Sequence, residues 1–116
     1  MAEQNCIFCQ VVAGKISADI IYNDERALAF RDINPQAPVH ALVIPREHMD
    51  SLDDAAGRDE ATLGHLLRVA ARVANAEGLS QKGYRTVINT GAGAGQSVFH
   101  LHLHIIGGRP LGWPPG

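Results

Sequence analysis

The stretch Gln96-Ser-Val-Phe-His-Leu-His-Leu-His-Ile-Ile106 decides the fold of this chain. Histidines at 100, 102 and 104 alternate in it with apolar residues, and this period of two predicts a β-strand over residues 98–106. Alternate residues of a strand share one face, so we expect the three imidazoles to project together, about 6.5 Å apart, with the apolar face in the core. Histidines rarely gather for packing alone, so this row indicates phosphate chemistry or a metal site.

Length and composition predict a single domain spanning residues 1–116. Hydrophobic residues make up 46% of the chain, which is enough for a core, and the formal net charge is -2. Because there is no basic run, the sequence predicts no nucleic-acid partner. No apolar stretch approaches the roughly 20 residues of a spanning helix, and the N-terminus does not resemble a signal peptide. We therefore expect no membrane partner and a cytoplasmic location.

The remaining patterns predict an α+β domain with a five-stranded, mostly antiparallel sheet, one long helix on a face and a short N-terminal helix. Apolar spacing predicts the helices at 6–13 and 59–76, with a single helical turn at 49–52. Strand patterns occur at 20–22, 27–31, 40–45, 85–89 and 98–106, and the first two form a hairpin. The long helix carries one apolar stripe, Leu63, Leu66, Leu67, Ala70, Val73 and Ala74.

A glycine-rich loop, Thr90-Gly-Ala-Gly-Ala-Gly-Gln-Ser97, leads into the histidine stretch. Its glycines allow several N–H groups to turn toward one anion. Alone, the loop is equally consistent with a flexible connection, but a phosphate held there lies within reach of the histidines. A neutral imidazole attacks phosphorus when an acceptor, such as another histidine or a main-chain carbonyl, holds its other nitrogen. Ser97 supplies the nearest hydroxyl for the leaving group.

Several motifs together carry a resemblance to a known family. His-Leu-His-Leu-His-Ile-Ile after Gly-Gln-Ser is similar to the histidine triad motif His-x-His-x-His-x-x. Further matching segments are Cys-Ile-Phe-Cys near the start, Phe-Arg-Asp-Ile-Asn-Pro-Gln-Ala-Pro at 30–38, His-Ala-Leu-Val-Ile-Pro at 40–45, and Gly-Gly-Arg…Trp-Pro-Pro-Gly at the end. Nearly end to end, the chain resembles the histidine triad (HIT) nucleotide-binding proteins, in their nucleoside phosphoramidase (Hint) branch.

The resemblance implies a role for each matching position. It makes His102 the nucleophile, with a catalytic group that also includes His104 on the phosphate, His40 in proton relay, Ser97, and His100. The positions that would line the phosphate and leaving group are Asn89, Gly95, Gln96 and Ser97. Asp32 would bind the ribose hydroxyls, as its charged acceptor oxygens suit a diol. The positions that would enclose the purine are Ile7, Phe8, Phe30 and Ile33.

Four of these residues also have a simpler explanation. Asp32 suits a turn before Asn34-Pro35, Phe30 and Ile33 suit the core, and His40 suits the surface.

The resemblance further implies a homodimer that pairs across the long helix and a strand, so that the two sheets continue into each other. Trp113 in the C-terminal tail would then approach the partner's active site and help select the leaving group, unless the tail is frayed.

The two cysteines, Cys6 and Cys9, form a Cys-x-x-Cys that supplies half of a tetrahedral zinc site. Related triad proteins with this pair bind zinc through two cysteines and two histidines, and here the matching histidines are His48 and His100. A structural zinc on these four residues is therefore expected, and catalysis would need no metal. The alternatives are two reduced cysteines and a redox pair. His65 in the long helix is expected at the surface or its boundary.

The implied activity is hydrolysis of purine nucleoside 5′-phosphoramidates, and of acyl-adenylate-like derivatives, through a nucleotidyl-histidine that releases the nucleoside monophosphate. One alternative is a dinucleoside polyphosphate hydrolase or nucleotidyl transferase of the same superfamily. Another is a nucleotide-binding scaffold without catalysis that regulates a partner protein.

Overall fold

A five-stranded sheet with the order β1-β2-β3-β5-β4 forms the frame of the molecule, and every neighbouring pair in it is antiparallel. The computed structural model describes residues 5–116. Its strands are β1 (Ile20–Asn23), β2 (Ala27–Arg31), β3 (Val39–Pro45), β4 (Tyr84–Val87) and β5 (Leu103–Gly107). Its helices are α1 (Ile7–Val12), α2 (Leu52–Ala56), α3 (Glu60–Ala76) and the 3-10 turn η2 (Ala92–Ala94). The α+β architecture expected from the sequence is confirmed.

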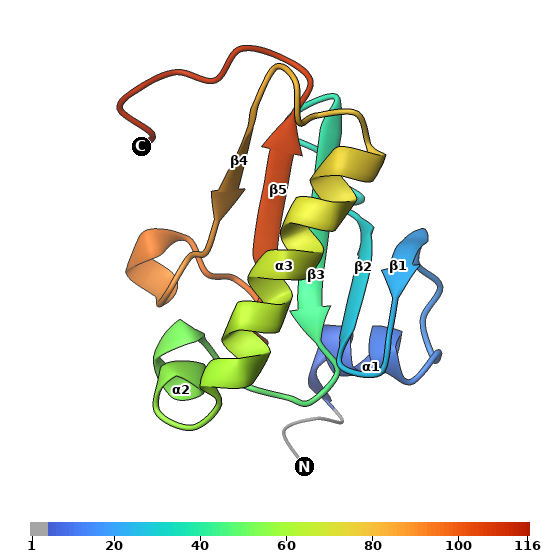
Figure 1. Ribbon diagram of the computed structural model, residues 1–116. Coiled ribbons are helices and arrows are strands. Elements are labelled where there is room, and N and C mark those ends of the chain that lie inside the picture. The colour runs from blue at the N-terminus through green and yellow to red at the C-terminus, as the bar shows by residue number, and fades with distance from the viewer. Residues whose placement is uncertain (1–4) are drawn as a thin grey trace.

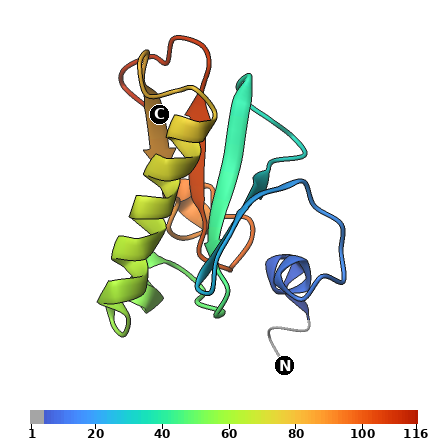
Figure 2. The same cartoon turned by 45° about the vertical axis from the view of Figure 1, so that its right-hand side comes forward.

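The two faces of the sheet are covered by different helices. The long helix α3 lies across one face, and the short α1 lies on the opposite side (Figures 1 and 2). Alternate residues of β2 divide between the two layers, with Ala27 and Ala29 packed under α3, and Leu28 and Phe30 packed with α1. No helix in residues 5–116 is long and apolar enough to cross a membrane.

Helix α3 begins and ends where the sequence predicts. The Asp59 side chain caps it by accepting from Thr62 N at 3.0 Å, and Gly78 follows its end with φ 79°. The predicted stripe is wrong at Leu67, which is 53% exposed, whereas Val69 is 1% exposed and takes its place. The buried line follows the 3.6-residue period from Leu66 through Val69.

The short elements differ from the predictions by a few residues. The turn expected at 49–52 is instead α2, which starts at Leu52 because the Ser51 hydroxyl accepts from Asp54 N. The fourth strand covers Tyr84–Val87 rather than residues 85–89. Both differences lie at element boundaries.

The predicted strand at 98–106 is wrong over residues 98–102, because pairing begins only at Leu103. Strand β3 pairs with β5 up to Val43↔Leu103, and beyond it Pro45 offers only a carbonyl, which the His100 ring occupies at 2.9 Å. The inward alternation nevertheless persists, since Leu101 and Leu103 are each 1% exposed. The first two histidines therefore lie on a loop that enters the sheet.

Candidate active site and metal centre

A cavity of about 610 Å³ is lined by residues of α1 and of strands β2, β3 and β5. It collects ten residues that the sequence marks as site residues, from both ends of the chain. These are Ile7, Phe8, Phe30, Asp32, Ile33, His40, Gly95, Ser97, His102 and His104. The structure thus brings two of the three triad histidines, the acidic ribose candidate and the apolar purine candidates to one place.

His102 is held as a neutral imidazole at the wall of this cavity. It is 7% exposed, and burial lowers its pKa. Its Nδ1 lies 2.7 Å from the main-chain oxygen of His100, and a carbonyl only accepts, so Nδ1 carries the proton. The Nε2 lone pair is left for chemistry, and the Phe8 ring packs edge-on at 5.1 Å between centroids.

His104 and His40 form a hydrogen-bonded pair next to the nucleophile candidate. Nε2 of His40 lies 2.9 Å from Nδ1 of His104, and Gln36 N donates to Nδ1 of His40 at 3.0 Å. The His104 ring centroid lies 5.0 Å from that of His102. Burial, followed by the neighbouring histidines, lowers the pKa of His104 to about 4, so this ring is neutral near pH 7.

Asp32 performs the turn role that the sequence allowed and also lines the cavity. Its Oδ1 accepts from Asn34 N at 2.8 Å, which fixes the turn that follows β2. Its Oδ2 lies 3.4 Å from His40 Nε2. With 19% of the side chain exposed, the carboxylate keeps acceptor capacity toward the cavity.

The other nominated residues lie outside the cavity lining. Gln96 is 3% exposed and braces the glycine loop, since it accepts from Gly91 N at 2.8 Å and donates to Asp50 O at 2.7 Å. The Asn89 side chain lies close to Gly95. Trp113 is 83% exposed in the C-terminal tail of this single chain.

Several lining residues were not identified from the sequence. They are Val11, Ile16, Ser17, Ala18, Arg31, Asn34, Gln36, Leu42 and Val98. Val11 and Leu42 follow from helix and strand periodicity, because they share faces with Phe8 and His40. Nothing in residues 16–18 signals a site, since this loop reaches the cavity only through the fold.

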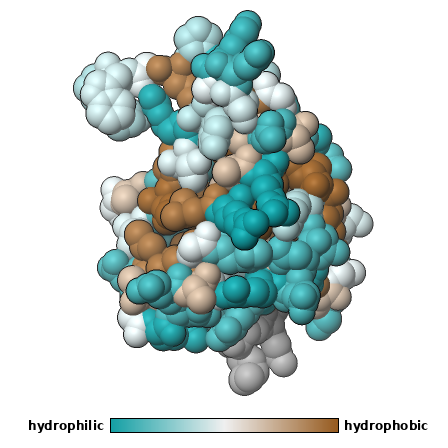
Figure 3. Space-filling model, in the orientation of Figure 1, coloured by the Kyte–Doolittle hydropathy of each residue, from teal (hydrophilic) through white to brown (hydrophobic). Residues whose placement is uncertain are grey.

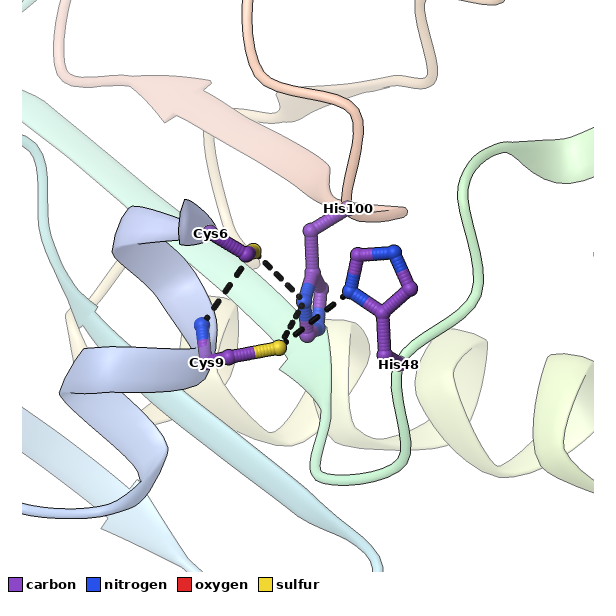
Figure 4. A group of neighbouring side chains, drawn as sticks. All are labelled: Cys6, Cys9, His48 and His100. Atoms are coloured by element: carbon purple, nitrogen blue, oxygen red, sulfur yellow. Dashed lines mark hydrogen bonds between the residues drawn. The ribbon is translucent and has the colours of Figure 1, made fainter. Parts of the chain in front are cut away.

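The second site is a cluster of two cysteines and two histidines at the N-terminus of α1 (Figure 4). Cys6 and Cys9 come from α1 and its cap, His48 from the loop after β3, and His100 from the segment before β5. Nδ1 of His100 lies 3.4 Å from both sulfurs, and Nδ1 of His48 lies 3.2 Å from Cys9 Sγ. Ideal tetrahedral zinc with two thiolates and two imidazoles places S and N about 3.6 Å apart.

The outer nitrogens of both histidines show that the inner ones are free to bind a metal. His48 Nε2 donates to Asp50 Oδ1 at 2.7 Å, and His100 Nε2 donates to Pro45 O at 2.9 Å. Each Nδ1 therefore presents a lone pair to the cysteines, which is the tautomer that metal-binding histidines adopt. The four residues fit one metal ion with no position left open for substrate, as in structural sites.

A second group with metal-ligating atoms is formed by Asp32, His40 and His104, but its histidines do not both offer a free lone pair. Gln36 N donates to His40 Nδ1, so His40 Nε2 carries a proton and has no lone pair for a metal. The hydrogen bonds within this group account for its close packing without an ion.

Comparison with known proteins places the chain in a family. The HIT domain model matches residues 13–111, and the chain belongs to this family. An uncharacterized HIT-like protein of Synechocystis is 53% identical over 116 residues, covering 100% of both chains. The crystal structure of a HIT family hydrolase from Legionella pneumophila superimposes with a TM-score of 0.93 at 48% identity, covering 97% of this chain and 100% of the other. A Zn-bound histidine triad family protein from Mycobacterium smegmatis gives 0.83 at 38% identity, covering 92% and 77%.

Proposed function

We propose that this protein hydrolyses purine nucleoside 5′-phosphoramidates, and related nucleoside monophosphate derivatives, through a covalent nucleotidyl-histidine. The observation that carries the proposal is the 2.7 Å contact from His102 Nδ1 to the His100 carbonyl, which leaves a neutral Nε2 at the wall of the cavity. Membership of the HIT family and the similarity to a HIT family hydrolase support it.

The reaction runs in two displacements at phosphorus. His102 Nε2 forms a bond to the α-phosphorus, the P–N bond to the amine breaks, and the amine departs with a proton passed on through the Ser97 hydroxyl or its neighbours. Water then attacks the same phosphorus, the bond to His102 breaks, and its electron pair returns to Nε2. The nucleoside monophosphate leaves, with the water proton released to solvent. His104 stabilises the charge on the phosphate oxygens by hydrogen bonding.

The rest of the cavity suits a purine ribonucleotide. Phe8 and Phe30 meet edge-to-face with centroids 5.5 Å apart and give one apolar wall, beside the half-exposed Ile7. Asp32 is the acceptor for the ribose hydroxyls. A dinucleoside polyphosphate would use the same nucleophile with a nucleotide leaving group, so it serves as the comparison substrate in the assay.

We infer that zinc is the metal of the Cys6, Cys9, His48 and His100 cluster and that it is structural. Two thiolates and two imidazoles favour zinc over harder ions, and a Zn-bound relative in the same family supports the assignment. No step of the reaction uses this ion. Metal analysis of protein purified without chelator tests the inference, and less than about half an equivalent would contradict it.

We also propose a homodimer formed across α3 and β4. Leu67 on α3 is 53% exposed and Tyr84 on β4 is 36% exposed, and apolar surface shows between the polar side chains of this face in Figure 3. A second copy would cover this surface and bring its own Trp113 tail toward the cavity. Sedimentation of the purified protein measures the oligomeric state, and a monomer at micromolar concentration would contradict the dimer.

The cytoplasmic location expected from the sequence stays a prediction.

Turnover of adenosine 5′-phosphoramidate by wild type and by His102→Ala tests the function. We expect release of the nucleoside monophosphate by wild type and a loss of at least about a thousandfold in the variant, because the nucleophile is gone. His65→Ala is the matched control, as His65 lies on α3 outside the cavity and should retain full activity. Equal rates in His102→Ala and wild type would refute the assignment, and nucleotide binding without turnover would favour a scaffold.

A further inference from the structure

We propose that His40 is held in a single tautomer that donates from Nε2 and cannot relay protons. Arg109 is the positioning residue that maintains this tautomer through the backbone of Gln36. The inference rests on the proposed function, for which it defines how the phosphate-binding His104 is oriented. It also gives a role to the Gly-Gly-Arg segment at 107–109, which lies outside the catalytic group.

The hydrogen bonds fix the protons of both rings. The Gln36 N–H can only donate, so His40 Nδ1, 3.0 Å away, must accept and His40 is neutral with its proton on Nε2. That proton points to His104 Nδ1 at 2.9 Å, a shorter contact than the 3.4 Å to Asp32 Oδ2. His104 Nδ1 therefore accepts, and the His104 proton sits on Nε2, the donor available to a phosphate oxygen.

The same chain of bonds excludes proton relay through His40. A relay would require His40 to give its Nε2 proton to His104 and to receive another on Nδ1. The group at Nδ1 is a backbone amide, which does not give up its proton near neutral pH, so the transfer would leave an imidazolate. His40 thus orients His104, and His104 donates a hydrogen bond to the phosphate. The proton for the leaving amine must come from the Ser97 side or from solvent.

Two contacts from the end of β5 hold the loop that carries the Gln36 amide. Arg109 Nη2 donates to Gln36 O at 3.0 Å. Gly108, at φ 93°, packs so closely on Pro38 that a Cβ at this position would lie 2.9 Å from Pro38 Cβ. His40 is only 6% exposed and cannot shift to follow its donor, so displacement of the loop would weaken the bond to Nδ1.

The tautomers of His40 and His104 are tested on the free protein, without any substrate. Long-range ¹H–¹⁵N correlation spectra of the imidazoles near neutral pH report which nitrogen of each ring carries the proton. We expect His40 and His104 to be single Nε2–H tautomers in wild type. A protonated Nδ1 on His40, as the other tautomer or as imidazolium, would overturn the proposal.

Arg109→Ala tests the positioning role, and Arg46→Ala is its matched control. Arg46 Nε also donates to a main-chain oxygen, that of Asp24 at 2.6 Å, but it neither contacts Gln36 nor lines the cavity. We expect Arg109→Ala to give a mixture of His40 tautomers and a kcat lowered about 3- to 10-fold with KM within twofold, the size of one lost hydrogen bond. Arg46→Ala should match wild type in both measurements.

Unchanged His40 tautomers in Arg109→Ala, or equal effects of the two arginine variants, would overturn the role of Arg109. The spectra separate this inference from the proposed function. If wild type fails to turn over phosphoramidates, the function is refuted, whereas the tautomers of His40 and His104 are still measured directly.

Discussion

Replacing His48 with alanine should remove most of the stabilisation that the proposed zinc ion gives this protein. His48 supplies one of four ligand atoms, its Nδ1 lying 3.2 Å from Cys9 Sγ. The cluster anchors α1, which at six residues is far below the roughly 12–15 that an isolated helix needs. The order of α1 therefore depends on docking, through Phe8, Val11 and the two cysteines.

The size of the effect follows from ligand linkage. Zinc at about 1,000 times its dissociation constant stabilises a one-site protein by about 4 kcal/mol. Interpolating between domain sizes, each kcal/mol moves Tm by about 3–6 °C for a chain of this length. Wild type should therefore melt about 12–24 °C higher with zinc than after treatment with chelator, and His48→Ala should lose most of that difference.

His65→Ala provides the control for this experiment. Its imidazole also makes a 2.7 Å contact to a carboxylate, Asp24, as His48 does to Asp50, but no cysteine lies beside it. Melting of the three proteins by circular dichroism, with zinc and with chelator, measures the shifts. A zinc-dependent shift in His48→Ala equal to that of wild type would refute the four-ligand site.

Three further outcomes are expected. Gly107→Ala places a Cβ 2.9 Å from two carbons of the buried Leu79, so it should cost about 1–3 kcal/mol by urea unfolding, and a Leu79→Ala background should remove most of that cost. Burial alone would raise the pKa of Asp24, but hydrogen bonds from backbone N–H groups, Tyr22 and His65 outweigh it and hold that pKa well below its usual range. This stabilisation is fully present above about pH 4 and is lost gradually as the pH falls toward the folded-state pKa. The difference in unfolding free energy between wild type and Asp24→Asn should therefore narrow, without closing, on acidification from pH 6 to 3. Asp32→Asn should raise KM for a ribonucleoside phosphoramidate about tenfold and leave KM for the 2′,3′-dideoxy analogue unchanged, and equal effects on both would exclude the ribose contact.

Local pattern was sufficient for most elements of this fold. The 3.6-residue period, the Asp59 cap and Gly78 predict α3 almost to the residue, and short apolar runs bounded by turn residues or proline predict β2 and β3. The failures have tertiary causes. The strand expected from residue 98 begins at Leu103, because the Pro45 carbonyl binds a side chain instead of a neighbouring strand.

The candidate site was predictable in its residue types and not in its hydrogen bonding. The family resemblance singled out His40, His102 and His104, and the structure brings them to one cavity. The groups that fix their protons are the backbone N–H of Gln36 and the carbonyl of His100. Main-chain groups carry no residue type, so a sequence pattern does not reveal them.

The placement of Phe8 couples the geometry of the cysteine–histidine cluster to the position of the His102 ring. Its ring packs edge-on against His102 at 5.1 Å, His100 at 6.0 Å and Phe30 at 5.5 Å, on the helix that also carries Cys9. A change in the size of residue 8 would disturb the proposed zinc cluster and the proposed nucleophile together. Under the proposed function, altered base preference is therefore most accessible at Ile33, which also lines the cavity but is 98% exposed, so its side chain can change without moving a cysteine or a triad histidine.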